Sequence, residues 1–426
     1  WMTAPENYVG AVDLSTNFVG THTDRDNPLS DTVINVENIT LFGDIDFVMT
    51  GDGNDNIIKS DSGNDYLYGG DGNDILKPGS GDDYVYGEGG DDILILTGSG
   101  TQYYNGGEGV DTFTLDYANF EGPALNPDHP QIIEIDLERG ISGQKDNDNL
   151  QDTLHSIENV TFKGDVNVII TGNEFANIIR GGSGDDQNFG GLGNDTIYAS
   201  IGKDIEDGGE GNDTYIIDGD MDYVPVIDLI NETAYLQGTE PVYDNAVRNF
   251  ENVTMLGSTD VEIRGNETNN IITGGSGNDT LSTGAGDDKL FGGLGDDILI
   301  INGTGDSVLD GGDGVDTFKI DLTDYTPPTN NPNQGIDGID GAVSSIGTLG
   351  SEIVISVNWT PHTELQYDND VEWYQGSNNF IEWEVETVDG TNQIIMSKNI
   401  YGGEKPHNLM SVSAWNGDLS GHDLIN

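Results

Sequence analysis

The sequence contains no cysteine and very few basic residues. Because cysteine is missing from all 426 residues, disulfide bonds and thiolate metal sites are excluded. Only 14 Lys and Arg residues face 77 Asp and Glu residues, which gives a formal net charge of -63. A chain of this charge repels nucleic acid and anionic membranes. We therefore expect neither as a partner.

Long hydrophobic runs and catalytic motifs are also missing. No stretch approaches the ~18 consecutive apolar residues that a membrane span requires, and residues 1–25 contain no basic region followed by an apolar core, so no signal peptide is predicted. The histidines form no H-E-x-x-H motif, and neither a G-x-S-x-G elbow nor a G-x-x-x-x-G-K-S/T loop occurs. The chain is therefore predicted not to be an enzyme.

What the chain does contain is 62 glycines and one plan repeated three times. Each copy begins with an extended V/I-D-L segment, continues to an E-N-I/V-T motif, and enters a tract rich in glycine and aspartate that closes on G-V/N-D-T-F/Y. Because the three copies keep this order, internal repetition is the organising principle of the chain. We predict three tandem blocks at residues 1–120, 121–220 and 221–325.

Within the tracts, an aspartate and an apolar residue recur about every nine residues. The period can be written G-G-x-G-x-D-x-U-x, where U is apolar. In the first tract the U position is predicted to hold Ile57, Leu67, Leu76, Val85, Leu94 and Phe113. The aspartate position is predicted to hold Asp55, Asp65, Asp74, Asp83, Asp92, Asp111, Asp186, Asp195, Asp204, Asp213, Asp279, Asp288, Asp297 and Asp316.

This pattern resembles the RTX, or hemolysin-type, calcium-binding nonapeptide repeat family. The resemblance implies an all-β fold of three tandem parallel β-roll (β-solenoid) tracts, each preceded by a metal-free lead-in coil. Two nonapeptides then complete one coil, and the turns present carboxylates and backbone carbonyls to Ca²⁺. The 14 aspartates named above become the predicted ligands of roughly 8–14 calcium ions. Because the apolar core is thin, we expect calcium binding and folding to be one event.

Several positions depart from the repeat. Asn177 and Asn270 occupy the aspartate position where lead-in coils join tracts, as neutral transitions. Asn188 and Glu206 occupy apolar positions two repeats apart, so they should lie on the same face of the second roll. Two interpretations remain open for this pair: a weakened, hydrated coil, or a ligand or contact site.

The last part of the chain has a different composition. Residues 322–341 read as a linker of Pro, Asn and Gly, and residues 342–426 are predicted to form a C-terminal β-rich, sandwich-like domain. Its four tryptophans either fill the core of that domain or form a contact with carbohydrate or another partner. They are Trp359, Trp373, Trp383 and Trp415.

Two functions fit these features. The first is an extracellular calcium-binding scaffold that serves as a structural surface protein, such as an S-layer, filament or adhesin segment, and that self-associates or binds a cell-surface or extracellular-matrix partner. The second is the calcium-folding and secretion module of a larger enzyme or toxin whose active domain lies outside this chain. The family resemblance implies bacterial type I secretion to the extracellular space or cell surface in both cases.

Overall fold

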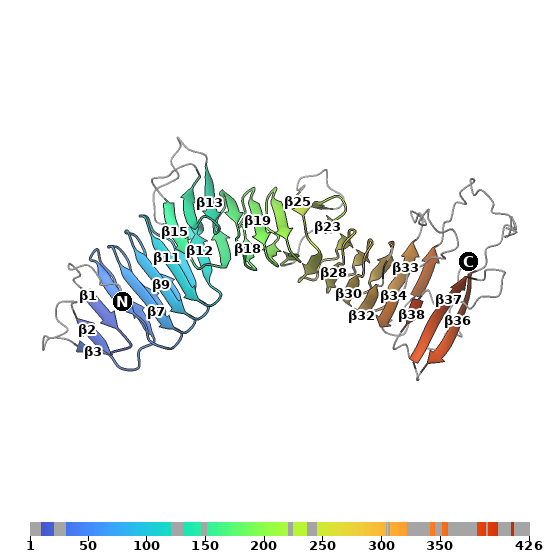
Figure 1. Cartoon of the computed structure of the whole chain (residues 1–426), viewed down its shortest axis with the longest axis horizontal. Helices are drawn as coiled ribbons and strands as arrows, with labels where there is room; N and C mark the ends of the chain where they lie inside the picture. Colours follow the sequence, from blue (N-terminus) through green and yellow to red (C-terminus); the bar gives the residue numbers. More distant parts are fainter. Residues whose placement is uncertain are drawn as a thin grey trace. The chain divides into compact units, whose positions relative to one another are not determined.

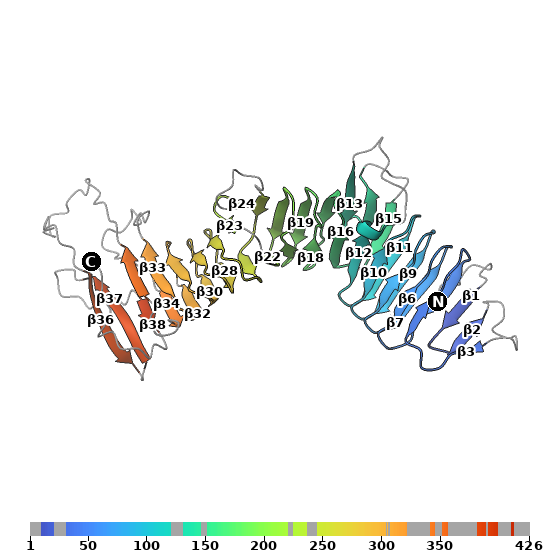
Figure 2. The ribbon, with the colours of Figure 1, turned by 180° about the vertical axis from the view of Figure 1, so that it is seen from behind.

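The structure is a computed structural model (Figures 1 and 2). It describes residues 10–20, 31–120, 131–145, 151–219, 225–236, 245–303, 305 and 307–321, together with the strand segments 341–345, 352–356, 381–388, 391–398 and 410–412. The chain divides into two compact units. The first comprises Trp1–Tyr215 and Tyr243–Phe250, and the second Ile216–Val242 and Glu251–Asn426. Strand β22 (Thr214–Ile217) contains the division.

The first unit is a roll in which the chain alternates between two mainly parallel sheets. Sheet B contains β4 (Asn38–Thr40), β6 (Ile57–Lys59), β8 (Ile75–Lys77), β10 (Ile93–Leu96), β12 (Thr112–Asp116), β16 (Asn159–Lys163), β18 (Ile178–Arg180) and β20 (Thr196–Tyr198). A single 3₁₀ turn, η2 (Tyr117–Asn119), follows β12. Sheet A contains β1 (Gly10–Asp13), β2 (Phe18–Gly20), β3 (Asp31–Thr32), β5 (Phe47–Thr50), β7 (Tyr66–Asp71), β9 (Tyr84–Gly89), β11 (Tyr103–Glu108), β13 (Ile132–Asp136), β14 (Ile141–Gln144), β15 (Gln151–His155), β17 (Asn167–Thr171), β19 (Gln187–Leu192), β21 (Ile205–Glu210) and β25 (Asn245–Arg248).

Successive coils lie in register, one coil being about two repeats long. Leu67 of β7 lies beside Val85 of β9, and Leu76 of β8 lies beside Leu94 of β10. All four side chains point into the roll and are fully buried. Because side chains in a strand alternate between its two faces, one or two apolar residues per short strand reach the interior, as Leu94 and Leu96 of β10 do. The residues at the apolar repeat position form a pair of columns, as the repeat predicts.

The first coil of this core corrects one predicted position. Ile58, and not Ile57, is the fully buried residue of β6, and it pairs with Leu76 of β8. Ile57 is only partly buried. A shift of one residue turns a strand over, so the predicted register was wrong by one residue at this coil.

The V/I-D-L segments begin short antiparallel hairpins ahead of the tracts. In the first unit β1 pairs with β2, and β13 with β14. The same β1 and β13 also pair in parallel with β5 and β17, which joins each hairpin to the following coil. The aspartate of each motif stabilises the hairpin turn: Asp13 accepts the backbone N–H of Thr16 at 3.0 Å, and Asp136 that of Arg139 at 2.8 Å.

The second unit is built on the same plan. One sheet contains β23 (Pro225–Asp228), β24 (Thr233–Leu236), β27 (Glu262–Arg264), β29 (Thr280–Ser282), β31 (Ile298–Ile301), β33 (Thr317–Asp321) and β35 (Glu352–Ser356). The facing sheet contains β26 (Asn252–Met255), β28 (Ile271–Gly275), β30 (Lys289–Leu294), β32 (Val308–Asp313), β34 (Gly341–Ser345) and β38 (Met410–Val412). Both β34 and β35 pair in parallel with strands of the roll, β32 and β33 respectively.

The remaining described strands form an antiparallel hairpin of β36 (Ile381–Val388) and β37 (Thr391–Lys398). Most of residues 342–426 lie outside the described part of the chain, so the sandwich-like domain stays a prediction. The same holds for the tryptophan contact, because Trp359, Trp373 and Trp415 lie outside the described residues and only the backbone of Trp383 is described. Among the described residues, no helix is long and apolar enough to cross a membrane.

Candidate metal centre

The repeat aspartates form ladders along the turn edges of each unit. In the first unit the Oδ1 atom of Asp92 accepts the backbone N–H of Asp74 at 2.7 Å, and the Oδ1 atom of Asp111 accepts that of Asp92 at 2.8 Å. In the second unit Asp297 accepts the backbone N–H of Asp279 at 2.8 Å. Each carboxylate therefore joins its own coil to the preceding one, and one of its two oxygens is used in this way.

The other carboxylate oxygen has no such partner. A buried polar atom without a partner is costly and requires an explanation. Burial raises the pKa of Asp92 to about 7 and that of Asp83 to about 8. The aspartates whose Oδ2 atom is buried and accepts no hydrogen bond are Asp65, Asp74, Asp83, Asp92, Asp111, Asp186, Asp195, Asp279, Asp288 and Asp297.

A small space beside these oxygens is kept open by the first glycine of the repeat. A Cβ atom added to Gly87 would lie 2.0 Å from Oδ2 of Asp92 and 2.4 Å from the carbonyl oxygen of Gly106 in the next coil. A Cβ atom on Gly292 would lie 2.2 Å from Oδ2 of Asp297 and 2.5 Å from the carbonyl oxygen of Gly311. We call this space, between a carboxylate oxygen and a carbonyl oxygen, the glycine cradle. Hard oxygen donors of these two kinds are the ligands that Ca²⁺ prefers, so the residues fit that ion.

On the opposite turn edge of each unit the cradle is often filled by a side chain. In the first unit the same position holds Ser60 and Pro78, and the Ser60 hydroxyl donates to the Pro78 carbonyl oxygen at 2.6 Å. In the second tract Ala199 stands there, and the hydroxyl of the next residue, Ser200, donates to Oδ2 of Asp204 at 3.0 Å. The turns are therefore not equivalent, and those that begin with glycine offer the more open oxygen site.

Asp55 does not belong to the buried ladder. Its side chain is exposed, and the buried position is held by Asn56, whose backbone N–H donates to Oδ1 of Asp74 at 2.7 Å. Asp55 instead accepts the backbone N–H of Asn73 at 2.8 Å. It begins an exposed second ladder, in which Asn73 accepts from Asp91 at 2.9 Å. The sequence signal for this ladder is the Asn or Asp that precedes most of the buried aspartates; Asp111, Asp204 and Asp316 follow Val or Lys instead.

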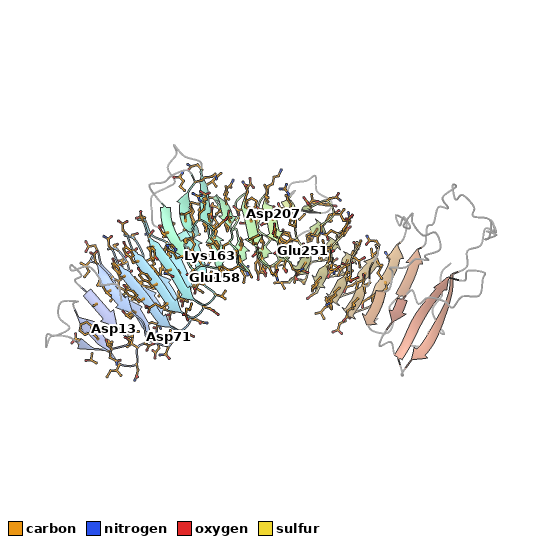
Figure 3. The ribbon with its side chains drawn as sticks, in the orientation of Figure 1. Asp13, Asp71, Glu158, Lys163, Asp207 and Glu251 are labelled. Atoms are coloured by element: carbon orange, nitrogen blue, oxygen red, sulfur yellow. The ribbon has the colours of Figure 1, made fainter. Side chains whose placement is uncertain are left out.

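Asparagine occupies the first buried position of every tract. The Nδ2 group of Asn177 donates to the backbone carbonyl oxygen of Glu158 at 2.5 Å, and that of Asn270 donates to Glu251 at 2.8 Å. Asn56 makes the same contact with Glu37 at 2.8 Å. The side chains of Glu158 and Glu251 are labelled in Figure 3. Because an amide donor satisfies the carbonyl without a cation, these turns are neutral transitions, as predicted for Asn177 and Asn270.

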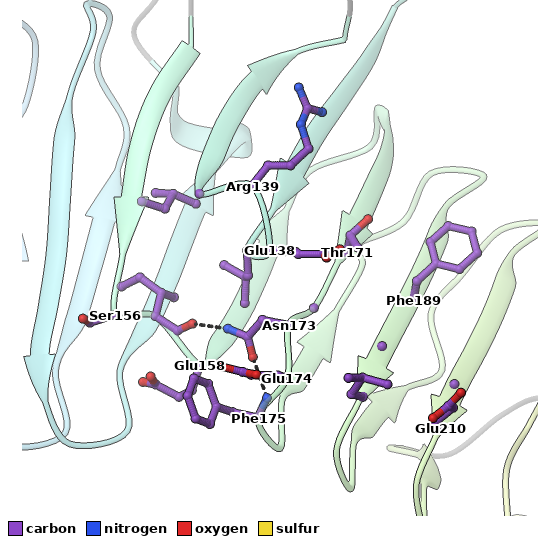
Figure 4. A pocket seen from close by; sticks show the side chains of 18 of the residues that line it. Glu138, Arg139, Ser156, Glu158, Thr171, Asn173, Glu174, Phe175, Phe189 and Glu210 are labelled. Atoms are coloured by element: carbon purple, nitrogen blue, oxygen red, sulfur yellow. Dashed lines mark hydrogen bonds between the residues drawn. The ribbon is translucent and has the colours of Figure 1, made fainter.

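An open groove of about 1100 Å³ lies beside the first of these turns in the second tract (Figure 4). Asn173 lines this groove. The Nδ2 group of Asn173 donates to the carbonyl oxygen of Ile157 at 3.1 Å, and its Oδ1 atom accepts the backbone N–H of Phe175 at 2.9 Å. Glu158 and Glu174 lie beside it. These hydrogen bonds hold the turn in shape, and the acidic lining matches the character of the whole chain.

Side-chain carboxylates alone do not build a metal site in the described parts of the chain. No group of three or more His, Cys, Asp or Glu side chains within them is arranged to hold a metal ion. Each glycine-first turn supplies one carboxylate, and the other donors at the cradle are backbone carbonyls. The predicted calcium site is therefore built by the turn of the repeat, and it needs no cluster of acidic side chains. Nine of the predicted aspartates lie in such turns, whereas the turns of Asp65, Asp83, Asp204 and Asp288 begin with another residue. The role of all of them as ligands stays a prediction.

The comparison with known protein families agrees with this geometry. A family model described as the RTX calcium-binding nonapeptide repeat (4 copies) matches residues 42–76, 50–84, 59–94, 79–100, 169–197, 189–215, 264–299 and 303–319. A search of curated proteins finds no match to the chain. The matched segments contain every predicted aspartate except Asp111. Such repeats form calcium-dependent β-roll modules and are typical of extracellular proteins exported by type I secretion. The chain therefore carries multiple copies of the RTX calcium-binding nonapeptide repeat over these segments.

Proposed function

We propose that the chain is an extracellular, calcium-folded scaffold that serves as a structural segment of a surface protein, such as an S-layer, filament or adhesin. It acts by presenting repeated surfaces and not by catalysing a reaction. Calcium gives the roll its shape, and copies of the chain or components of the cell surface are its partners.

The observation that carries this proposal is a pair of tyrosine rows on the outer face of sheet A in the first unit. The rings of Tyr66 and Tyr84 stack with centroids 4.7 Å apart, and those of Tyr68 and Tyr86 stack 5.1 Å apart. Tyr103 of the next coil continues both rows. We call these five residues the tyrosine face. Aromatic residues are enriched where protein surfaces meet, and a face that repeats with the coil suits a partner that is itself repeated.

The net charge of -63 opposes self-association in the absence of calcium. Bound calcium lowers that charge, so we expect assembly to depend on calcium. Electron microscopy of the purified chain should show lattices or filaments with Ca²⁺ and none in a chelator. Particles that stay isolated under both conditions would argue against the proposal and favour the alternative, a calcium-folding and secretion module of a larger enzyme or toxin.

A matched pair of variants tests the surface itself. The double variant Tyr84→Ser/Tyr86→Ser should keep the calcium-dependent β spectrum and lose assembly. Ile93→Ser alters an exposed side chain on the other sheet, 38% exposed, and should assemble normally. If the tyrosine variant assembled as well as the Ile93 variant, the tyrosine face would not be the contact surface.

A further inference from the structure

The apolar column inside the second tract is interrupted by two polar side chains. In sheet A of the first unit Ile170 lies beside Asn188, Asn188 beside Glu206, and Glu206 beside Val247. Asn188 and Glu206 are both completely buried. A carboxylate in the core of a roll this narrow destabilises the fold unless it is neutralised or paired.

None of the four side-chain polar atoms of this pair has a hydrogen-bond partner. Both oxygens of Glu206 are without a donor, and so are the amide oxygen and nitrogen of Asn188. The carboxylates of Asp204 and Asp186 add negative charge nearby. The pair therefore lacks a compensating positive charge.

The pair is continuous with a glycine cradle at the turn edge. A Cβ atom on Gly181 would lie 2.9 Å from Oδ2 of Asp186, and 2.6 and 3.2 Å from the two polar atoms of the Asn188 amide. In the turns that begin with Gly87 and Gly292 the same space meets a backbone carbonyl oxygen of the next coil. Here a core side chain takes the place of that carbonyl, so the space at the turn opens towards the interior of the roll. Either amide atom can face it, because a half-turn of the amide exchanges them.

We propose that a divalent cation, Ca²⁺, binds inside the roll at this point, held by the Glu206 carboxylate, the amide oxygen of Asn188 and Oδ2 of Asp186. All three are hard oxygen donors, and Ca²⁺ accepts six to eight of them from carboxylates, amides, carbonyls and water. The cation supplies the positive charge that the buried carboxylates lack. The site differs from the turn sites of the repeat because two of its ligands come from positions that the repeat reserves for apolar residues. It does not depend on the assembly role proposed above.

The ion count of the whole chain tests this proposal. Native mass spectrometry at saturating calcium should show one ion fewer for Glu206→Gln than for the unaltered chain. Glu210→Gln makes the same change at an exposed position of the same strand and should leave the count unchanged. If Glu206 were only a protonated partner of Asn188, glutamine would replace it without losing an ion, so an unchanged count for Glu206→Gln would overturn the proposal.

A second variant covers the case in which Glu206→Gln fails to fold. Asn188→Asp adds a carboxylate at nearly constant size. With a cation in the site, the calcium concentration at half-folding, measured by circular dichroism, should fall at least twofold. Without one, a further buried carboxylate destabilises the roll, so a midpoint moved to higher calcium would contradict the proposal.

Discussion

At Asp92 the two oxygens of one carboxylate have different roles. Oδ1 accepts the backbone N–H of Asp74 at 2.7 Å, whereas Oδ2 is buried beside Gly87 without a hydrogen bond. The first oxygen joins two coils with or without metal. The second is costly without a cation and becomes a ligand when calcium is present. The same residue therefore opposes folding in a chelator and favours it in calcium.

Asp92→Asn separates these roles, because the amide keeps the acceptor oxygen and loses the charge. In saturating calcium we expect the free energy of unfolding to fall by about 3 kcal/mol, the contribution of one ligand at about 100-fold above its Kd. In a chelator the same variant should gain β structure at a higher pH than the unaltered chain on acidification, because it buries one charge fewer. Urea unfolding measures the loss in calcium, and far-UV circular dichroism against pH measures the gain in a chelator. Asp91→Asn, at an exposed neighbouring position, is the control, and equal effects of the two variants would contradict the assignment.

Gly87→Ala tests the cradle through its steric requirement. The added methyl group would lie 2.0 Å from the carboxylate oxygen of Asp92, closer than atoms can approach. We expect this variant to lose one bound calcium ion. Overpacking should lower its free energy of unfolding by a further amount of about 1–3 kcal/mol. At Gly89 a methyl group meets nothing closer than 3.4 Å, so Gly89→Ala should bind the normal number of ions. Isothermal titration calorimetry of both variants gives the comparison, and a normal ion count for Gly87→Ala would exclude the cradle as a site.

At the scale of the element, each turn edge of the roll is a column of buried aspartate carboxylates, and burial raises the pKa of several of them. Burial raises the pKa of Asp92 and Asp279 to about 7, and that of Asp83 to about 8. In the unfolded chain each would titrate near 3.9. Between about pH 4 and pH 8 the unfolded chain therefore binds fewer protons than the calcium-free roll, and the stability of that roll falls as the pH rises.

Acidification should therefore stabilise the calcium-free roll but weaken the binding of calcium to it. In a chelator, acidification from pH 8 to pH 4 should increase the β content measured by far-UV circular dichroism. In calcium, protons compete with the ion for the same oxygens, so the calcium concentration that half-saturates the roll, measured by titration calorimetry, should rise as the pH falls. A chelator titration in which acidification decreases the β content would show that the carboxylates are not buried as described.

The elements also show how far the repeat pattern can be read from sequence. A period of nine predicts the strands, the inward residues from Leu67 onwards and the buried aspartates after the first coil. It fails at Asp55 because G-D-G-N-D matches the motif one residue early. The correct register depends on whether Ile57 or Ile58 points inwards, and both are isoleucine. The asparagine contacts to the E-N-I/V-T motif and the exposed ladder depend on neighbouring coils, which a linear pattern does not contain.

At the scale of the whole molecule, composition and fold are reconciled by calcium. A chain with a net charge of -63 and 34% hydrophobic residues has the composition of a disordered protein. Each unit nevertheless forms a regular roll whose buried carboxylates face small oxygen-lined spaces. The apolar columns alone leave those charges uncompensated. We therefore expect the chain to bind its ions and to fold in one event.

Far-UV circular dichroism of the purified chain at pH 8 tests this expectation most directly. With calcium added to a chelated sample, a disordered spectrum should change to a β-rich one in a cooperative and reversible transition, and magnesium at the same concentration should not replace calcium. A spectrum that stays β-rich at pH 8 in excess chelator would contradict the account.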